Sequence, residues 1–272
     1  MTDVTVLERL ERCYDAIPRV GGAVVEAVGP FELFLRQGPG WQYYARPRLG
    51  SGSVTAADVE AVRSRQRALG APEAIEWVVD VTPSLRAAAE EAGLPVLLAP
   101  LMVLDPTALS HGSDNAFLLD PDDPSFADLY AVSSAVAHLG FGSPGVLPGA
   151  VGPAERDAAA AARPVEPDLL EFVAAGLRSG TMAEAVVRVP GDGIVARGAI
   201  QSALGAAEIV GVATLPSARR QGHGAAVSAL LARVALERGN DLVFLSAANE
   251  DVARVYASIG FRHVGTAGIA EP

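Results

Sequence analysis

The sequence has little cysteine and little charge, and it has no lysine. Cys13 is the single cysteine among 272 residues, which excludes an internal disulfide and a cysteine metal cluster. Charged residues make up 19% of the chain and hydrophobic residues 50%, too little charge for a disordered chain and enough apolar material for buried cores. We therefore expect a globular protein without a metal site.

No hydrophobic run is long enough to cross a membrane. The longest nearly apolar stretch, Leu94 to Leu104, contains two prolines and is about half of the ~20 residues that a membrane-spanning helix needs. Residues 1–13 include acidic side chains and no apolar signal core, so export is not expected. Together with the lone cysteine, these features predict a cytoplasmic location. The net charge of −11 disfavours nucleic acid as a partner, because an acidic surface repels the phosphate backbone.

Turn residues and hydrophobic periodicity divide the chain into two α/β halves, with domains expected at 1–108 and 109–272. The elements expected in the first half are helix 4–17, strands 22–28, 31–37 and 41–46, helix 55–69, strand 75–81, helix 82–92 and strand 95–104. A turn-rich tract over 105–123 precedes the elements of the second half. These are expected to be helices 125–139 and 153–178, strands 182–189, 194–204 and 208–215, helix 222–238, strand 241–247, helix 249–258 and strand 261–266. Prolines interrupt the helix over 153–178.

The two halves end in the same order of elements. Sliding the sequence by 167 positions aligns Trp77 with Phe244 and Gly93 with Gly260 without a gap. This register predicts an internal duplication.

A glycine motif gives the strongest chemical signal. Arg219, Gly222 and Gly224 have the spacing R-x-x-G-x-G between a β-rich run and an amphipathic helix. Glycines allow the backbone to approach an anion closely, and the N–H groups of residues 220–225 would meet at the positive end of the helix. The pattern predicts a pyrophosphate cradle, and it matches neither the dinucleotide fingerprint nor a P-loop. The alternative is a glycine-rich turn that only caps a surface helix.

With its surroundings, this motif resembles the GNAT superfamily of acyl-CoA-dependent N-acyltransferases. The resemblance covers residues 116–267, where the motif is followed by the strand DLVFLSA, Asn249, Tyr256 and Gly260-Phe261 in the family's order. It implies an α/β fold of two GNAT-like domains, each a mixed, mostly antiparallel twisted sheet flanked by helices.

The first half departs from the motif. Gly52, Thr55 and Ala57 stand at the positions of Arg219, Gly222 and Gly224. We therefore expect this half to be a degenerate, non-catalytic GNAT-like domain, or else an unrelated α/β cap.

The resemblance also implies roles for individual residues. The strand 209–214 would diverge from the strand 243–247 and hold the pantetheine arm of acetyl-CoA through its backbone. Tyr256 would assist the leaving thiolate, and Glu208 is the candidate base, with water or another residue as the alternative. His223 occupies a variable position of the motif and is expected on the loop surface. The residues implied to bind the cofactor are Val212, Ala213, Thr214, Arg219, Arg220, Gln221, Gly222, His223, Gly224, Ala225 and Asn249.

Two functions follow from these features. The first is transfer of an acetyl group from acetyl-CoA to a primary amine of a small-molecule or peptidyl acceptor by direct attack, and the acidic surface favours a cationic acceptor. The second is a non-catalytic acyl-CoA-binding or interaction protein that keeps the cradle without turnover. The presence of both Glu208 and Tyr256 favours the enzyme.

Overall fold

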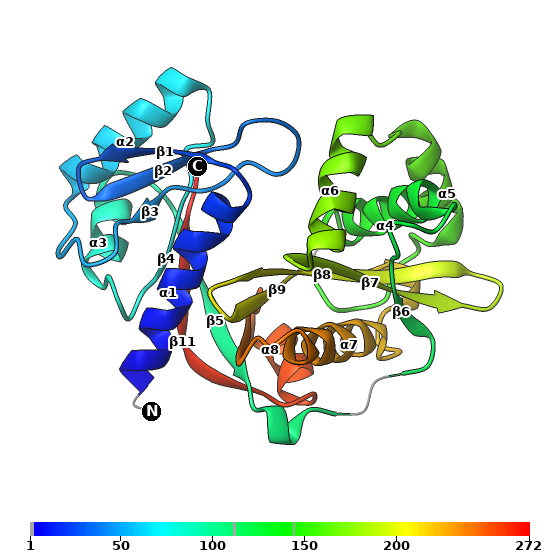
Figure 1. The fold of residues 1–272 in the computed structure, drawn as a ribbon. Helices are drawn as coiled ribbons and strands as arrows, with labels where there is room; N and C mark the ends of the chain where they lie inside the picture. Colours follow the sequence, from blue (N-terminus) through cyan, green and yellow to red (C-terminus); the bar gives the residue numbers. More distant parts are fainter. Residues whose placement is uncertain (1–2, 111–112, 144) are drawn as a thin grey trace. The chain divides into compact units, whose positions relative to one another are not determined.

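The computed structural model of the chain describes residues 3–110, 113–143 and 145–272 (Figure 1). The chain divides into two compact units. The first unit comprises residues up to Met102 together with Ser246–Asn249 and His263–Pro272, and the second comprises Val103–Leu245 and Glu250–Arg262. The C-terminal segment of the chain therefore belongs to the first unit.

The first unit contains a small antiparallel sheet in the order β1-β2-β3 and a second group of strands in the order β4-β11-β5. Strand β11 runs antiparallel to β4, and Ala267 lies opposite Val78. Its elements are α1 (Asp3–Val20), β1 (Val24–Val28), β2 (Phe31–Leu35), β3 (Arg46–Pro47), α2 (Ala56–Leu69), β4 (Ile75–Val78), α3 (Ser84–Glu91), β5 (Val96–Leu104) and most of β11 (Phe261–Ala270).

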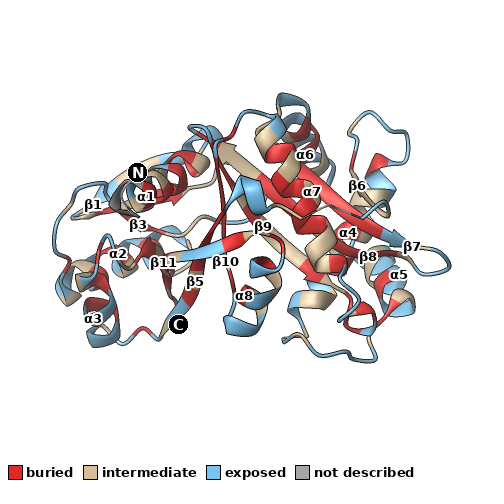
Figure 2. Ribbon diagram, turned by 90° about the horizontal axis from the view of Figure 1, so that it is seen from below, coloured by how far each residue is buried: buried red, intermediate tan, exposed pale blue. Residues whose placement is uncertain are grey.

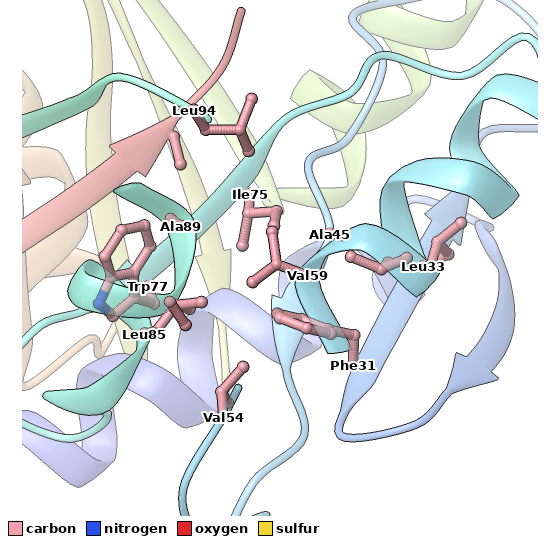
Figure 3. Close-up of a cluster of buried hydrophobic side chains, with 13 residues drawn as sticks. Phe31, Leu33, Ala45, Val54, Val59, Ile75, Trp77, Leu85, Ala89 and Leu94 are labelled. Atoms are coloured by element: carbon pink, nitrogen blue, oxygen red, sulfur yellow. The ribbon is translucent and has the colours of Figure 1, made fainter. Parts of the chain in front are cut away.

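The core of this unit is built from side chains of β2, α2, β4 and α3 (Figure 3). Phe31 and Trp77 are the largest side chains in it and are fully buried. The C-terminal strand closes over the indole at a glycine, because a Cβ atom on Gly268 would lie 2.5 Å from Cζ2 of Trp77. Gly268 thus permits β11 to lie against the largest side chain of this core.

The second unit contains strands in the order β10-β9-β8-β7-β6, antiparallel except for the parallel pair β9 and β10. Its elements are η1 (Pro106–Ala108), β6 (Ala116–Leu118), α4 (Phe126–Phe141), α5 (Pro153–Ala162), α6 (Pro167–Ser179), β7 (Met182–Val189), β8 (Gly193–Ala203), β9 (Ala206–Thr214), η2 (Pro216–Ala218), α7 (His223–Glu237), β10 (Leu242–Ser246) and α8 (Glu250–Ala257).

Helices cover both faces of this sheet. Helices α4, α5 and α6 lie over one face of β7 and β8, and α7 lies over the other (Figure 1). The approach of α7 depends on Gly198 of β8, where a Cβ atom would lie 2.7 Å from Cγ1 of Val227. Both β8 and α7 carry long buried stretches (Figure 2).

The expected α/β fold with mostly antiparallel sheets and flanking helices is confirmed, as is the order of elements in the first half. The expected strand over 41–46 is wrong, because β3 is limited to Arg46–Pro47. The Arg36 guanidinium donates hydrogen bonds to the carbonyls of Pro39 and Trp41 and holds this segment as a loop. The turn-rich tract over 105–123 also contains the short strand β6, whose three residues give almost no periodic signal.

Candidate functional site

Strands β9 and β10 pair over only a part of their lengths. Their parallel pairing begins at Ala206 and ends at Glu208, which lies opposite Phe244, whereas β9 continues to Thr214. The divergence expected after Glu208 is therefore present. It leaves the backbone groups of β9 from residue 209 onward without β10 as a partner on that edge.

The loop after β9 presents a set of backbone donors. Arg220 and Gly222 have positive φ angles of 65° and 80°, and Gly222 is the N-cap of α7. In the described part of the chain, no protein acceptor receives the N–H groups of residues 220–225. A Cβ atom on Gly222 would have no neighbour within 4 Å, so the space over this helix end is open. The residues fit an anionic group such as a pyrophosphate.

The charge around this loop favours an anion. The N-terminus of α7 carries the positive end of the helix dipole. Arg220 is exposed, and no other described residue forms an ion pair with it. The chain has no Asp or Glu between Glu208 and Glu237, although its net charge is −11.

Arg219 fixes the loop rather than extending into it. Its guanidinium donates hydrogen bonds to the carbonyl oxygens of Gly140 at 3.0 Å, Ser143 at 2.5 Å and Leu147 at 3.3 Å. These carbonyls belong to the C-terminal end of α4 and the segment that follows it. A cation is favourable at the C-terminal end of a helix. Through these hydrogen bonds, Arg219 joins the α4–α5 connection to the glycine loop.

His223 is not on the loop surface, and that expectation is wrong. It is the first residue of α7 and is 9% exposed. His223, Val227 and Leu231 are spaced four residues apart, so the histidine lies on the side of α7 that faces the sheet. Its Nε2 atom is buried with no hydrogen-bond partner among the described residues, and burial lowers its pKa. Neutral imidazole is therefore favoured at this helix N-terminus.

The two candidate catalytic residues lie on different elements of the second unit. Glu208 is half-buried on β9 opposite Gln201 of β8. Side chains alternate along a strand, so Gln201 and Arg197 share the face of β8 that α4 covers, and Glu208 shares it with them.

Tyr256 lies on α8 and is 7% exposed, with its ring edge-to-face against Phe261. Burial raises the pKa of Tyr256 to about 12. The phenol therefore remains protonated at neutral pH and can donate a hydrogen bond. Asn249 is exposed and belongs to the first unit, so its role in binding stays a prediction.

The second unit also contains a buried polar network that the sequence does not predict. It consists of Ser133 on α4, Glu184 on β7 and Arg197 on β8. The available signal was a charged residue in the middle of each of two largely apolar strands, Glu184 in β7 and Arg197 in β8, but the pattern alone does not show that they face each other.

Helix α2 of the first unit, which the 167-position register aligns with α7, begins differently. Helix α2 begins 167 positions before α7, and its N-terminus is closed by a capping box in which Thr55 accepts from the N–H of Asp58 and Asp58 accepts from the N–H of Thr55. A carboxylate thus occupies the helix end where an anion would otherwise bind.

The described ranges contain neither a metal-binding cluster nor a membrane-spanning helix. No group of three or more His, Cys, Asp or Glu side chains is arranged to hold a metal ion there. None of the helices in these ranges combines the length and the apolar character that a membrane span requires.

The chain is similar to known proteins at two levels. Residues 192–267 match the family model described as FR47-like protein. None of the curated proteins matches the chain significantly.

Among solved structures, a GCN5-related N-acetyltransferase from Kribbella flavida is 21% identical, with a TM-score of 0.69 over 98% of this chain and 95% of that one. A GCN5-related N-acetyltransferase-like protein from Streptococcus suis is 14% identical, with a TM-score of 0.55 over 98% of each chain. A tandem GNAT protein from the clavulanic acid biosynthesis pathway is 15% identical, with a TM-score of 0.52 over 94% of this chain and 87% of that one. The diverging strands, the glycine loop and these similarities together identify the fold as that of the GNAT superfamily.

Proposed function

We propose that the protein is an acyl-CoA-dependent N-acetyltransferase that transfers an acetyl group from acetyl-CoA to a primary amine of a small-molecule or peptidyl acceptor. The main support is the set of backbone N–H groups over residues 220–225, which have no acceptor among the residues that the structure describes and meet at the N-terminus of α7. This arrangement follows directly after a strand that has diverged from its neighbour. Together they suit a ligand that has a pyrophosphate and an extended arm.

Acetyl-CoA would supply an acyl group activated as a thioester. Residues 220–225 would hold its pyrophosphate, and the backbone of Val212, Ala213 and Thr214 would bond its arm. Arg219 would act indirectly, by fixing the loop to the carbonyls after α4.

In the reaction, the amine nitrogen forms a bond to the carbonyl carbon and the carbon–sulfur bond breaks. The nitrogen loses a proton and the sulfur gains one. An alkyl amine is mostly protonated at neutral pH, so a base must accept protons, and Glu208, on the α4 face of β9, is the residue that we propose for this step. Tyr256 would donate to the departing sulfur, because its pKa of about 12 keeps the phenol protonated.

We further propose that the first half, residues 1–108, is a non-catalytic GNAT-like domain and that residues 109–272 form the catalytic domain. The capping box at α2 supports this assignment, since Asp58 already fills the helix end. The net charge of −11 favours a cationic acceptor, not nucleic acid, and we propose a cytoplasmic location.

The test is calorimetric titration of acetyl-CoA into the full chain and into Gly222→Val. The side chain would enter the open space over the helix end, so we expect acetyl-CoA binding to weaken by about 2 kcal/mol or more, roughly thirtyfold. Gly239→Val is the matched control, because Gly239 lies at the other end of α7 with a similar φ of 85° and no neighbour within 4 Å. Equal affinity in folded Gly222→Val and wild type would refute the placement of the cofactor.

A further inference from the structure

The buried network of Ser133, Glu184 and Arg197 holds a guanidinium in a fixed orientation. Arg197 Nη2 lies 2.7 Å from Oε2 of Glu184. Ser133 Oγ donates to the other carboxylate oxygen of Glu184 and accepts a hydrogen bond from Arg197 Nε at 3.3 Å. Ser133 is 0% and Glu184 3% exposed, and the Arg197 side chain is 13% exposed, so the carboxylate and the hydroxyl find their partners away from water.

The remaining arm of the guanidinium reaches β9. Arg197 Nη1 donates to the carbonyl oxygen of Gly211 at 3.2 Å. Gly211 has a φ of 61°, and a Cβ atom there would lie 2.6 Å from Arg197 Nη1. Both the backbone conformation and the close approach of the guanidinium therefore require glycine at this position.

Gly211 belongs to a β-bulge. Arg197 lies opposite Ala213, but Ala199, two residues later, lies opposite Val210. Residues 211 and 212 therefore oppose the single residue 198. A bulge of this kind changes the direction of the backbone that follows it. It falls after the last β9–β10 pair, at the start of the segment 212–214 that we propose to bond the pantetheine arm.

We propose that Arg197, Glu184 and Ser133 are positioning residues, which hold the Gly211 bulge and so orient the backbone groups of residues 212–214 toward the acyl-pantetheine arm. This inference rests on the proposed function. A planar guanidinium fits the role because its fork donates to a carboxylate, a hydroxyl and a carbonyl at once, which the single ammonium group of lysine does not reproduce. Ser133 also connects this hydrogen-bond network to α4.

Two ligands distinguish positioning of the arm from general damage to the fold. The nucleotide part of coenzyme A, 3′-phospho-ADP, probes the glycine loop alone, and acetyl-CoA probes the loop and the arm. Arg197→Lys keeps a positive charge beside Glu184 but loses the fork. We expect it to weaken acetyl-CoA binding about tenfold, as loss of hydrogen bonding would, and to leave binding of 3′-phospho-ADP within about twofold.

Arg156→Lys is the matched control. Arg156 is an arginine of the same unit whose side chain is 6% exposed, against 13% for Arg197, and it donates to the carbonyls of Asp192 and Ile194 at the β7–β8 turn. We expect this variant to unfold at a lower temperature and to bind both ligands with unchanged affinity.

Several outcomes would overturn the positioning role. These are unchanged acetyl-CoA affinity in folded Arg197→Lys, an equal loss for both ligands, and a similar loss in Arg156→Lys. If Arg197→Lys does not fold, Ser133→Ala provides the same comparison, with an expected loss of about threefold for acetyl-CoA alone. Failure of the wild type to bind either ligand would overturn the proposed function and this inference with it, so the two failures are distinguishable.

Discussion

Gly198→Ala places one methyl group between β8 and α7. The added Cβ would lie 2.7 Å from Cγ1 of Val227, 3.1 Å from Cδ1 of Leu231 and 3.2 Å from Cγ2 of Val212. Val227 is β-branched and cannot rotate away freely. Overpacking of this kind lowers the free energy of unfolding by about 1–3 kcal/mol. The lower conformational entropy of the unfolded chain with alanine offsets about 0.4–1 kcal/mol of this loss. We expect a net loss of about 1–2 kcal/mol in the free energy of unfolding of the second unit.

Urea denaturation followed by far-UV circular dichroism, a signal that does not depend on tryptophan, measures this loss of stability. Val227→Ala in the same chain removes the nearest atom, so the double variant should be less destabilised than the sum of the singles, by about 0.5 kcal/mol or more. Gly224→Ala is the control, because its Cβ would make only ordinary contacts at 3.6 and 3.8 Å. A Gly198→Ala variant as stable as wild type, or additive single and double variants, would show that the close approach of α7 is not what requires glycine.

Three further predictions concern titration, turnover and stoichiometry. Burial raises the pKa of Glu11 above its ordinary 4.5, so the folded state favours the protonated form and the free energy of unfolding should fall as pH rises above 4.5. Glu11→Gln keeps an acceptor for the N–H of Val78 and should flatten this fall in urea titrations between pH 4.5 and 7; an unchanged slope would contradict it. Tyr256→Phe and Glu208→Gln should each lower turnover by ~10²–10⁴ with little change in acetyl-CoA affinity, and high pH should rescue only the Glu208 variant. Calorimetry should saturate at one acetyl-CoA per chain, because Asp58 closes the equivalent helix end in the first unit, and two equivalents would refute this.

The sequence predicts the parts of this protein that depend on local order. Glycine after a periodic segment marked the end of helices such as α2, which Gly70 closes, and the order strand, glycine loop, helix indicated the fold family. The loop at Gly222 could be placed because its chemistry comes from consecutive backbone groups, so the spacing of the residues contains most of the geometry.

Features that depend on contacts between distant residues could not be predicted. His223 was expected at the surface because it occupies a variable position of the glycine motif, and its burial depends on the sheet beneath α7. The Arg197 network joins residues 64 and 13 positions apart through register and a bulge, neither of which periodicity specifies. The place of β11 in the first unit is likewise set by pairing with β4, not by any signal within either strand.

The position of β11 has a consequence for biosynthesis. The first unit needs residues 263–270, which pair with β4 and close over Trp77 at Gly268, yet the ribosome makes these residues only after the second unit. Domains generally fold as units in the order of their synthesis. The core of the first unit therefore stays incomplete until residue 270 has been made, and a chain terminated before residue 263 should be recognisable to proteases by its unfinished first unit.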